Sequence, residues 1–155
     1  RKDRTRHGGG VILYIRKHIV FQRLLDIECD LEAIWIRIKM RNMKSLLICV
    51  LYRPPSCSVD FFDTLAVMVD KALDSDSEIL IMGDFNCDLF SENPDSNSQA
   101  LLSIMHGSLL MQLITCPTRV AQNSKTLIDH KLCIPLVQII ILCQELSKPI
   151  SVTTF

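Results

Sequence analysis

A short apolar run that stops at a glycine does most to constrain the fold of this chain. Residues 79–82 read Ile-Leu-Ile-Met, and Gly83, Asp84, Phe85 and Asn86 follow directly. An apolar run of this length, bounded by glycine, is typical of a strand buried on both faces. If extended backbone continues past the glycine, Asp84 and Asn86 share one face and Phe85 packs on the other. A carboxylate beside a carboxamide can take a proton from water and hydrogen-bond a phosphate oxygen. The alternative is a strand that ends in an ordinary Asx turn.

Apolar patterns before this run predict two further strands. Residues 31–40 alternate in hydrophobicity, which is typical of a half-buried strand. We expect the face that carries Ile34, Ile36 and Ile38 to be the more buried one. Residues 46–51 are apolar throughout and predict a buried strand that forms a hairpin with the first.

Helical spacing separates two of these strands. Residues 61–73 place their apolar side chains on one face of a predicted helix. A right-handed crossover through this helix would pair the strands at 46–51 and 79–82 in parallel. The other predicted elements are a turn at 8–10, a strand at 11–15, a connection at 16–30, a helix at 98–106 that Gly107 ends, a strand or helical turn at 109–114 and a last strand at 126–132. No linker or repeat divides the sequence, so one domain is expected.

The charge balance gives the chain no general attraction to nucleic acid, since 17 Lys+Arg residues offset 17 Asp+Glu residues. The basic residues Arg1, Lys2, Arg4, Arg6 and His7 would either form a local patch or an ordinary solvated end.

The cysteines and the apolar pattern of the sequence indicate a reducing, intracellular compartment. The seven cysteines are odd in number and none is spaced as Cys-x-x-Cys, so neither a disulfide framework nor a zinc site is predicted. No signal peptide is visible, and the longest apolar stretch, residues 132–143, is too short to cross a bilayer. We therefore expect an intracellular protein, in the cytoplasm or nucleus, with reduced thiols and with no membrane or disulfide partner.

Four stretches, in order, resemble motifs of the endonuclease/exonuclease/phosphatase superfamily, and in particular the endonuclease domains of non-long-terminal-repeat retrotransposons. Gly-Asp-Phe-Asn at 83–86 resembles the superfamily's signature. The other three are Gly-Gly-Gly-Val-Ile-Leu-Tyr-Ile at 8–15, Leu-Tyr-Arg-Pro-Pro at 51–55, and Pro-Thr-Arg at 117–119 followed by Thr-Leu-Ile-Asp-His at 126–130. The resemblance covers about residues 8–130 and fades after that.

This resemblance implies a fold and an activity. The implied fold is α/β (α+β), a four-layer α/β/β/α sandwich of the deoxyribonuclease I-like type, incomplete at the N-terminus, so that residues 1–155 form a single partial domain. The implied activity is cleavage of phosphodiester or phosphomonoester bonds with a divalent metal, usually Mg²⁺, and the implied partner is DNA.

The resemblance also assigns catalytic residues. Asp84 matches the aspartate that activates or orients the attacking water, and Asn86 matches the amide that binds the phosphate. Tyr52 matches an active-site tyrosine, although a rim tyrosine that stacks on Pro54 is an equal alternative. Asp129 matches an aspartate that orients a catalytic histidine near the C-terminus.

Two further residues resemble phosphate-binding positions. Thr118 resembles a loop threonine near the phosphate, and Arg119 is placed to contact the nucleic-acid backbone. A plain turn with a solvated arginine is as good an interpretation. His130 lies on the strand face opposite Asp129, so we expect it to pack in the core.

The chain departs from the superfamily's pattern in two places. The superfamily's first motifs, an asparagine and a metal-binding glutamate, precede the Gly-rich stretch, and neither is matched here. Its final Ser-Asp-His is replaced by residues 146–152, Leu-Ser-Lys-Pro-Ile-Ser-Val. No residue is therefore assigned as a metal ligand. We expect a catalytically impaired fragment of an endonuclease domain; the alternative is a non-catalytic remnant or binding module of the same fold.

Overall fold

The computed structural model describes the chain except for residues 6–7, 59, 123, 135–151 and 155. The elements follow the order β1 (Lys2–Thr5), β2 (Gly8–Leu13), β3 (Phe21–Arg23), β4 (Glu32–Ile38), β5 (Ser45–Tyr52), α1 (Asp60–Leu73), β6 (Ser77–Asp84), α2 (Ser96–Gly107), β7 (Met111–Gln112), β8 (Arg119–Ala121), β9 (Ser124–Thr126), β10 (Asp129–Cys133) and β11 (Val152–Thr154). The described strands form three sheets.

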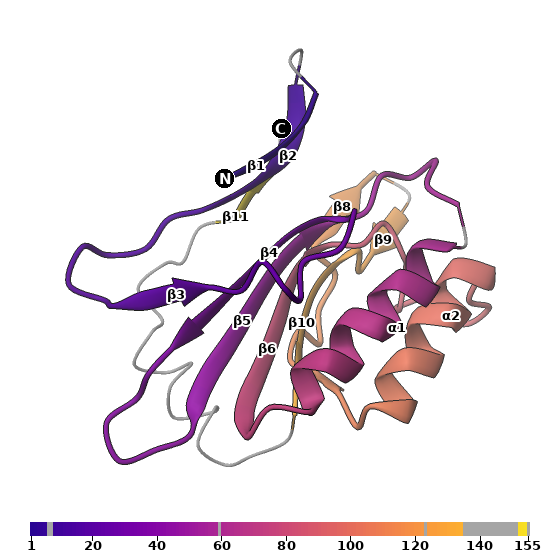
Figure 1. Cartoon of the computed structure of the whole chain (residues 1–155). Coiled ribbons are helices and arrows are strands. Elements are labelled where there is room, and N and C mark those ends of the chain that lie inside the picture. The colour runs from indigo at the N-terminus through magenta and orange to yellow at the C-terminus, as the bar shows by residue number, and fades with distance from the viewer. Residues whose placement is uncertain (6–7, 59, 123, 135–151, 155) are drawn as a thin grey trace.

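The central sheet has six strands in the order β3-β4-β5-β6-β10-β7 (Figure 1). Strands β5 and β6 pair in parallel through the α1 crossover, and the other neighbours are antiparallel. The predicted hairpin of β4 and β5 and the predicted parallel pair are therefore confirmed. The apolar runs of β5 and β6 are buried on both faces, as central strands of a covered sheet must be.

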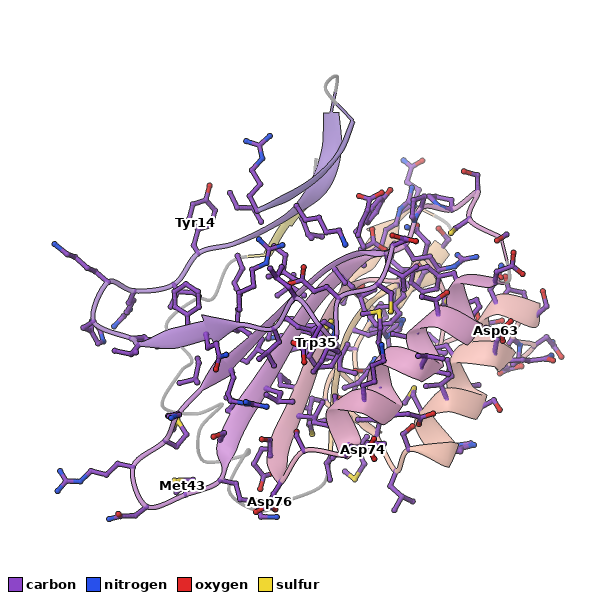
Figure 2. The ribbon with its side chains drawn as sticks, in the orientation of Figure 1. Tyr14, Trp35, Met43, Asp63, Asp74 and Asp76 are labelled. Atoms are coloured by element: carbon purple, nitrogen blue, oxygen red, sulfur yellow. The ribbon has the colours of Figure 1, made fainter. Side chains whose placement is uncertain are left out.

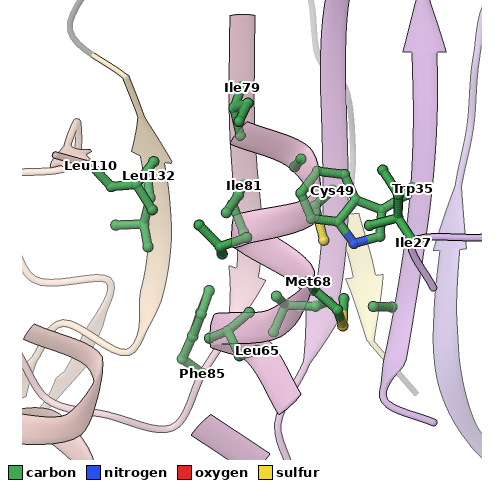
Figure 3. Close-up of a cluster of buried hydrophobic side chains, with 14 of the residues drawn as sticks. Ile27, Trp35, Cys49, Leu65, Met68, Ile79, Ile81, Phe85, Leu110 and Leu132 are labelled. Atoms are coloured by element: carbon green, nitrogen blue, oxygen red, sulfur yellow. The ribbon is translucent and has the colours of Figure 1, made fainter. Parts of the chain in front are cut away.

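Helices α1 and α2 lie together on one face of this sheet (Figure 1). The apolar face of α1 packs inward through side chains such as Leu65 and Met68, while Asp63 lies on its exposed side (Figure 2). Trp35 and Ile81 from the sheet complete the cluster beneath the helix (Figure 3). This burial of apolar surface is the main favourable term that holds the helices to the sheet.

The three-stranded sheet β1-β2-β11 lies toward the other face of the central sheet (Figure 1). Val11 of β2 is 1% exposed and belongs to a second apolar cluster with Ile36, Ile48 and Val50. A helix layer, the central sheet and this smaller sheet are thus three of the four layers expected for the deoxyribonuclease I-like sandwich. The α+β fold class agrees with the prediction.

The structure corrects the prediction of a half-buried strand at β4. Ala33 and Trp35 are 0% exposed, and Ile34 and Ile36 on the other face are 3% and 2% exposed, so both faces of the strand are buried over these residues. The strand lies between β3 and β5, with an apolar cluster on each side. The alternation in the sequence comes from two basic residues: Arg37 is half-buried near the end of the strand, and Lys39 is exposed just after it.

Smaller differences have local causes. The three glycines at 8–10 begin strand β2 rather than form a turn, and β3 lies inside the predicted connection. Helix α2 starts two residues early because the Asp95 carboxylate caps it by accepting the Ser98 N–H at 2.8 Å. The last predicted strand, 126–132, divides into the end of β9 and the start of β10, and Leu127 and Ile128 belong to neither.

Gly83 provides a test of the β5–β6 pairing. Its φ is +150°, and a Cβ added there would lie 1.8 Å from the Leu51 carbonyl oxygen of the neighbouring strand. Gly83→Ala should therefore lower the free energy of unfolding by more than about 2 kcal/mol, measured by urea denaturation. The matched control is Gly107→Ala, where nothing lies within 4 Å, and it should change stability by less than about 1 kcal/mol. Equal losses in the two variants would contradict the register of this strand pair.

Candidate functional site

Three strand ends meet at one edge of the central sheet. Tyr52 of β5 lies opposite Asp84 of β6 in the parallel pair, and Asp129 of β10 lies opposite Asp84 in the antiparallel pair. Residues paired in this way point to the same face of a sheet, and neighbouring strands lie about 4.8 Å apart. Asp84 therefore has Tyr52 on one side and Asp129 on the other. These three residues therefore lie together, while their catalytic roles stay predictions.

This face is the one that looks toward the smaller sheet. Along β6, Leu80 and Met82 share the face of Asp84, and both belong to the cluster that contains Val11 of β2. Tyr52 packs against the same cluster. The candidate site therefore opens on the side away from helices α1 and α2.

The backbone turns directly after Asp84. Its Oδ1 accepts the Asn86 N–H at 3.0 Å, and Asn86 has a φ of +48°. This is an Asx turn, so the extended backbone does not continue past Asp84. Phe85 is 0% exposed and packs in the core, as predicted.

The same turn brings Asn86 next to strand β5. Its Nδ2 donates a hydrogen bond to the Arg53 carbonyl oxygen at 2.8 Å. One N–H of the amide is thus used to fix the turn, and an amide of this kind has a second N–H and a carbonyl oxygen for other partners.

Arg53 is a structural residue of the site that the sequence patterns did not single out. Its backbone N–H donates to the Asp84 carbonyl oxygen at 2.9 Å, and its Nη1 donates to the Phe85 carbonyl oxygen at 3.5 Å. Together with the Asn86 bond, these contacts tie Arg53 to each of the residues 84–86. The only available signal was its position between a tyrosine and two prolines.

The Arg53 guanidinium is buried, with the residue 1% exposed. It lies over the rings of Phe61 and Phe62, 5.7 and 5.1 Å from their centroids, and its Nη2 donates to the Cys57 carbonyl oxygen at 3.2 Å. A desolvated cation is stabilised by the negative faces of such rings. Helix α1 therefore helps to hold the turn that carries the candidate site.

Thr118 and Arg119 lie beside the acidic pair. The Thr118 Oγ1 accepts the backbone N–H groups of Ile128 at 3.3 Å and Asp129 at 3.2 Å, so it fixes the start of β10. Arg119 begins β8, is exposed, and its charge acts to lower the pKa of Asp84. Both residues predicted to bind phosphate are thus at the site, although the threonine oxygen already serves the backbone.

Burial dominates the electrostatics of Asp84. It raises the pKa of this carboxyl above its usual value, and the charge of Asp129 raises it further. The Asn86 N–H and the Arg119 charge act in the opposite direction. A carboxylate with a raised pKa is a better proton acceptor near neutral pH than an ordinary aspartate.

His130 has the predicted packing role. It is 1% exposed, its Nε2 lies 2.9 Å from the Cys87 carbonyl oxygen, and its Nδ1 contacts the side chain of Gln112. Its ring packs edge-on to Phe85 at 5.3 Å, and burial lowers its pKa. The imidazole therefore points to the helix side of the sheet, away from the Asp129 carboxylate.

The donor set does not fit a divalent metal by itself. Mg²⁺ prefers six oxygen ligands in an octahedron and is usually held by one or two carboxylates together with waters and substrate phosphates. Across the described part of the chain, no three His, Cys, Asp or Glu side chains are grouped closely enough to hold a metal ion. Asp84 and Asp129 are the two carboxylates that converge here. The region 146–152, where the sequence departs from the superfamily's last motif, lies largely outside the described residues.

The raised pKa of Asp84 makes a prediction about stability. Because the folded state disfavours the charged carboxylate, Asp84 stabilises the fold below the pKa of an unfolded aspartate, and this contribution is lost as the pH rises through the folded pKa. Asp84→Asn removes the charge but keeps an oxygen that can accept the Asn86 N–H. The variant should therefore unfold at a higher temperature than the wild type at pH 7, and the gap should close below about pH 3.8.

Asp26→Asn is the control for this measurement, since Asp26 is an exposed carboxylate in the loop after β3. Thermal unfolding followed by circular dichroism should show little change for it at either pH. A lower midpoint for Asp84→Asn at pH 7, or a difference that does not vary with pH, would show that burial is not what perturbs this carboxyl.

Among the described residues, no helix is long and apolar enough to span a membrane.

The sequence matches no protein-family model and no curated protein. The fold resembles the endonuclease domain of TRAS1, a telomere-specific non-LTR retrotransposon, with a TM-score of 0.62, 14% sequence identity and 76% of this chain covered. Two structures from Bacteroides thetaiotaomicron are more distant, both with a TM-score of 0.45 and 17% identity over 66% of this chain: an endonuclease/exonuclease/phosphatase family protein, of which 41% is covered, and a mannosyl-6-phosphatase, of which 42% is covered.

The chain spans 54% of the length of the TRAS1 domain. Over the part that the two share, the chain therefore has the fold of the TRAS1 endonuclease domain.

Proposed function

We propose that this chain is part of the DNA endonuclease domain of a non-long-terminal-repeat retrotransposon, and that its site handles the water and the phosphate in phosphodiester hydrolysis. One observation carries the proposal. The strand register places Tyr52 and Asp129 on either side of Asp84, on one face and at one edge of the sheet. Each of these residues also lies in a stretch that resembles a superfamily motif, at the position where that motif carries an active-site residue.

The geometry supports a distinct role for each group. Asp84 is half-buried with a raised pKa, which suits a residue that takes a proton from the attacking water. Asn86 keeps one amide N–H for a phosphate oxygen after its bond to Arg53. Tyr52 is only partly buried, so it reaches the surface at the same edge. The exposed Arg119 would attract the phosphate backbone of DNA.

Residues 1–155 alone supply only part of the set of groups that this chemistry needs. In the superfamily Mg²⁺ neutralises charge on the phosphate and the leaving oxygen, and no glutamate within these residues matches the one that holds it. Among the described residues, no histidine side chain faces the Asp129 carboxylate, because the neighbouring His130 is turned into the core. Groups of this kind act as a unit, so a partial set retains little activity. We therefore propose that residues 1–155, taken alone, are catalytically impaired.

The alternative is a non-catalytic remnant or binding module of the same fold. This alternative is favoured because two of the polar side chains at the site are already hydrogen-bonded to the protein's own backbone. Asn86 donates to the Arg53 carbonyl oxygen, and the Thr118 hydroxyl oxygen accepts from two backbone N–H groups. If the turn is purely structural, the role of Asn86 and Thr118 is to make these backbone hydrogen bonds and not to bind a phosphate.

A nicking assay tests the proposal. The purified chain should show no Mg²⁺-dependent nicking of supercoiled plasmid above background, because loss of a single preorganised electrostatic group commonly costs about two to three orders of magnitude in rate. Calorimetric titration with Mg²⁺ should likewise detect no tight binding.

The matched variants for this assay are Asp84→Ala at the site and Asp26→Ala in an exposed loop. Robust nicking by the wild type that survives Asp26→Ala but disappears in Asp84→Ala would refute the impaired state and establish Asp84 as catalytic. Nicking that survives both changes would indicate a contaminating nuclease.

A further inference from the structure

The zero net charge conceals an uneven distribution of basic residues. Residues 4–25 and 33–59 together contain ten of the 17 Lys and Arg residues and none of the 17 Asp and Glu residues. A surface formed by both segments would therefore be strongly positive, whatever the balance of the whole chain.

The fold brings parts of both segments to one corner of the central sheet. Edge strand β3 pairs with the end of β4, so that Phe21 lies opposite Ile38. Residues 18–22 and 37–39 line a groove of about 530 Å³, which we call the Phe21 groove. Ile38 pairs with Leu46 at the start of β5, whereas Tyr52 ends the same strand. At about 3.3 Å per residue, the groove lies roughly 20 Å from the candidate hydrolytic site.

Three basic side chains line the Phe21 groove, His18, Arg37 and Lys39, and Arg16, Lys17 and Arg41 lie within two residues of them in the sequence. Five are exposed and Arg37 is half-buried; the exposed ones are Arg16, Lys17, His18, Lys39 and Arg41. None of these six forms an ion pair with a described residue, whereas the nearby Arg23 and Lys44 pair with Glu28 and Asp76. The charge at the groove is thus left uncompensated by the described part of the protein.

Aromatic side chains accompany these charges. Phe21 is 47% exposed and Tyr14 is 60% exposed. Tyr14 projects outward from the segment that joins β2 to β3 (Figure 2). Phe21 also lines a second hollow, of about 240 Å³, together with Arg1 and Arg23. An exposed ring flanked by cations is the arrangement with which proteins bind single-stranded nucleic acid, since bases stack on the ring and phosphates contact the charges.

We propose that the Phe21 groove binds single-stranded nucleic acid. Lys39, Arg37 and the basic residues after β2 contact the phosphates, and bases stack on Phe21 and Tyr14. The surface shares no residue with the candidate hydrolytic site, so the inference holds whether or not that site is active. A duplex is a poorer occupant, because its bases are already stacked on one another and cannot reach the rings.

Fluorescence anisotropy with a labelled oligothymidylate of about 20 nucleotides tests the proposal. Affinity should fall as salt is added, with a slope of about −0.7 in log–log form for each phosphate contacted. The double variant Arg37→Gln/Lys39→Gln should weaken binding at least about tenfold and reduce the magnitude of the slope by about 1.4. Phe21→Ala should weaken binding at least about fivefold without changing the slope.

The chain offers a matched control for each variant. Lys71→Gln/Lys125→Gln removes the same charge from exposed lysines on α1 and β9, and Phe90→Ala removes a ring that is 52% exposed in a loop elsewhere. Both controls should bind within about twofold of the wild type, and circular dichroism should show every variant folded. Equal weakening in the controls would reduce the effect to overall charge and overturn the proposal. No binding of the oligonucleotide would also overturn it, as would binding only to vesicles of anionic phospholipid.

Discussion

The parallel pairing of β5 with β6 is the interaction on which the rest of the structure depends. It joins two strands that are buried on both faces, it requires the α1 crossover, and it sets the ends of both strands level at Tyr52 and Asp84. The strands approach closely at their ends, where Gly83 lies against the Leu51 carbonyl oxygen and no other residue type fits without displacement. The position of the candidate site follows from this close approach, because it fixes where Asp84 leaves the sheet.

The contacts of Arg53 fix the turn that follows strand β6 and carries the candidate site. Arg53 is bonded to Asp84, Phe85 and Asn86, and its guanidinium is held between carbonyl oxygens and the rings of α1. A buried cation without a carboxylate partner is costly to place, and the aromatic faces and carbonyl dipoles offset part of that cost. Removal of Arg53 would therefore disturb the turn and the helix packing together. The residues proposed to contact a phosphate thus depend on an arginine whose side chain is buried.

Much of this arrangement could be predicted from local patterns. The apolar runs of β5 and β6 and the helical spacing of α1 predicted the crossover and the parallel pair. The burial of Trp35 was not predictable in the same way, because alternation reports polarity along one strand and does not reveal that both faces are covered by other elements. The role of Arg53 was hidden for a similar reason. Only the fold shows that the guanidinium turns inward onto Phe61 and Phe62, and a sequence pattern treats an arginine after a strand as solvated.

The central claim is that Asp84, Asp129 and Arg119 form one electrostatically coupled site. The most direct test is an NMR titration of the Asp84 carboxyl carbon in the wild type and in two variants. The structure predicts a wild-type pKa above the ordinary aspartate value, a lower pKa in Asp129→Asn because a repelling charge is removed, and a higher pKa in Arg119→Gln because an attracting charge is removed. A pKa of Asp84 that neither substitution moves would contradict the account, because it would mean that the three side chains do not share a site.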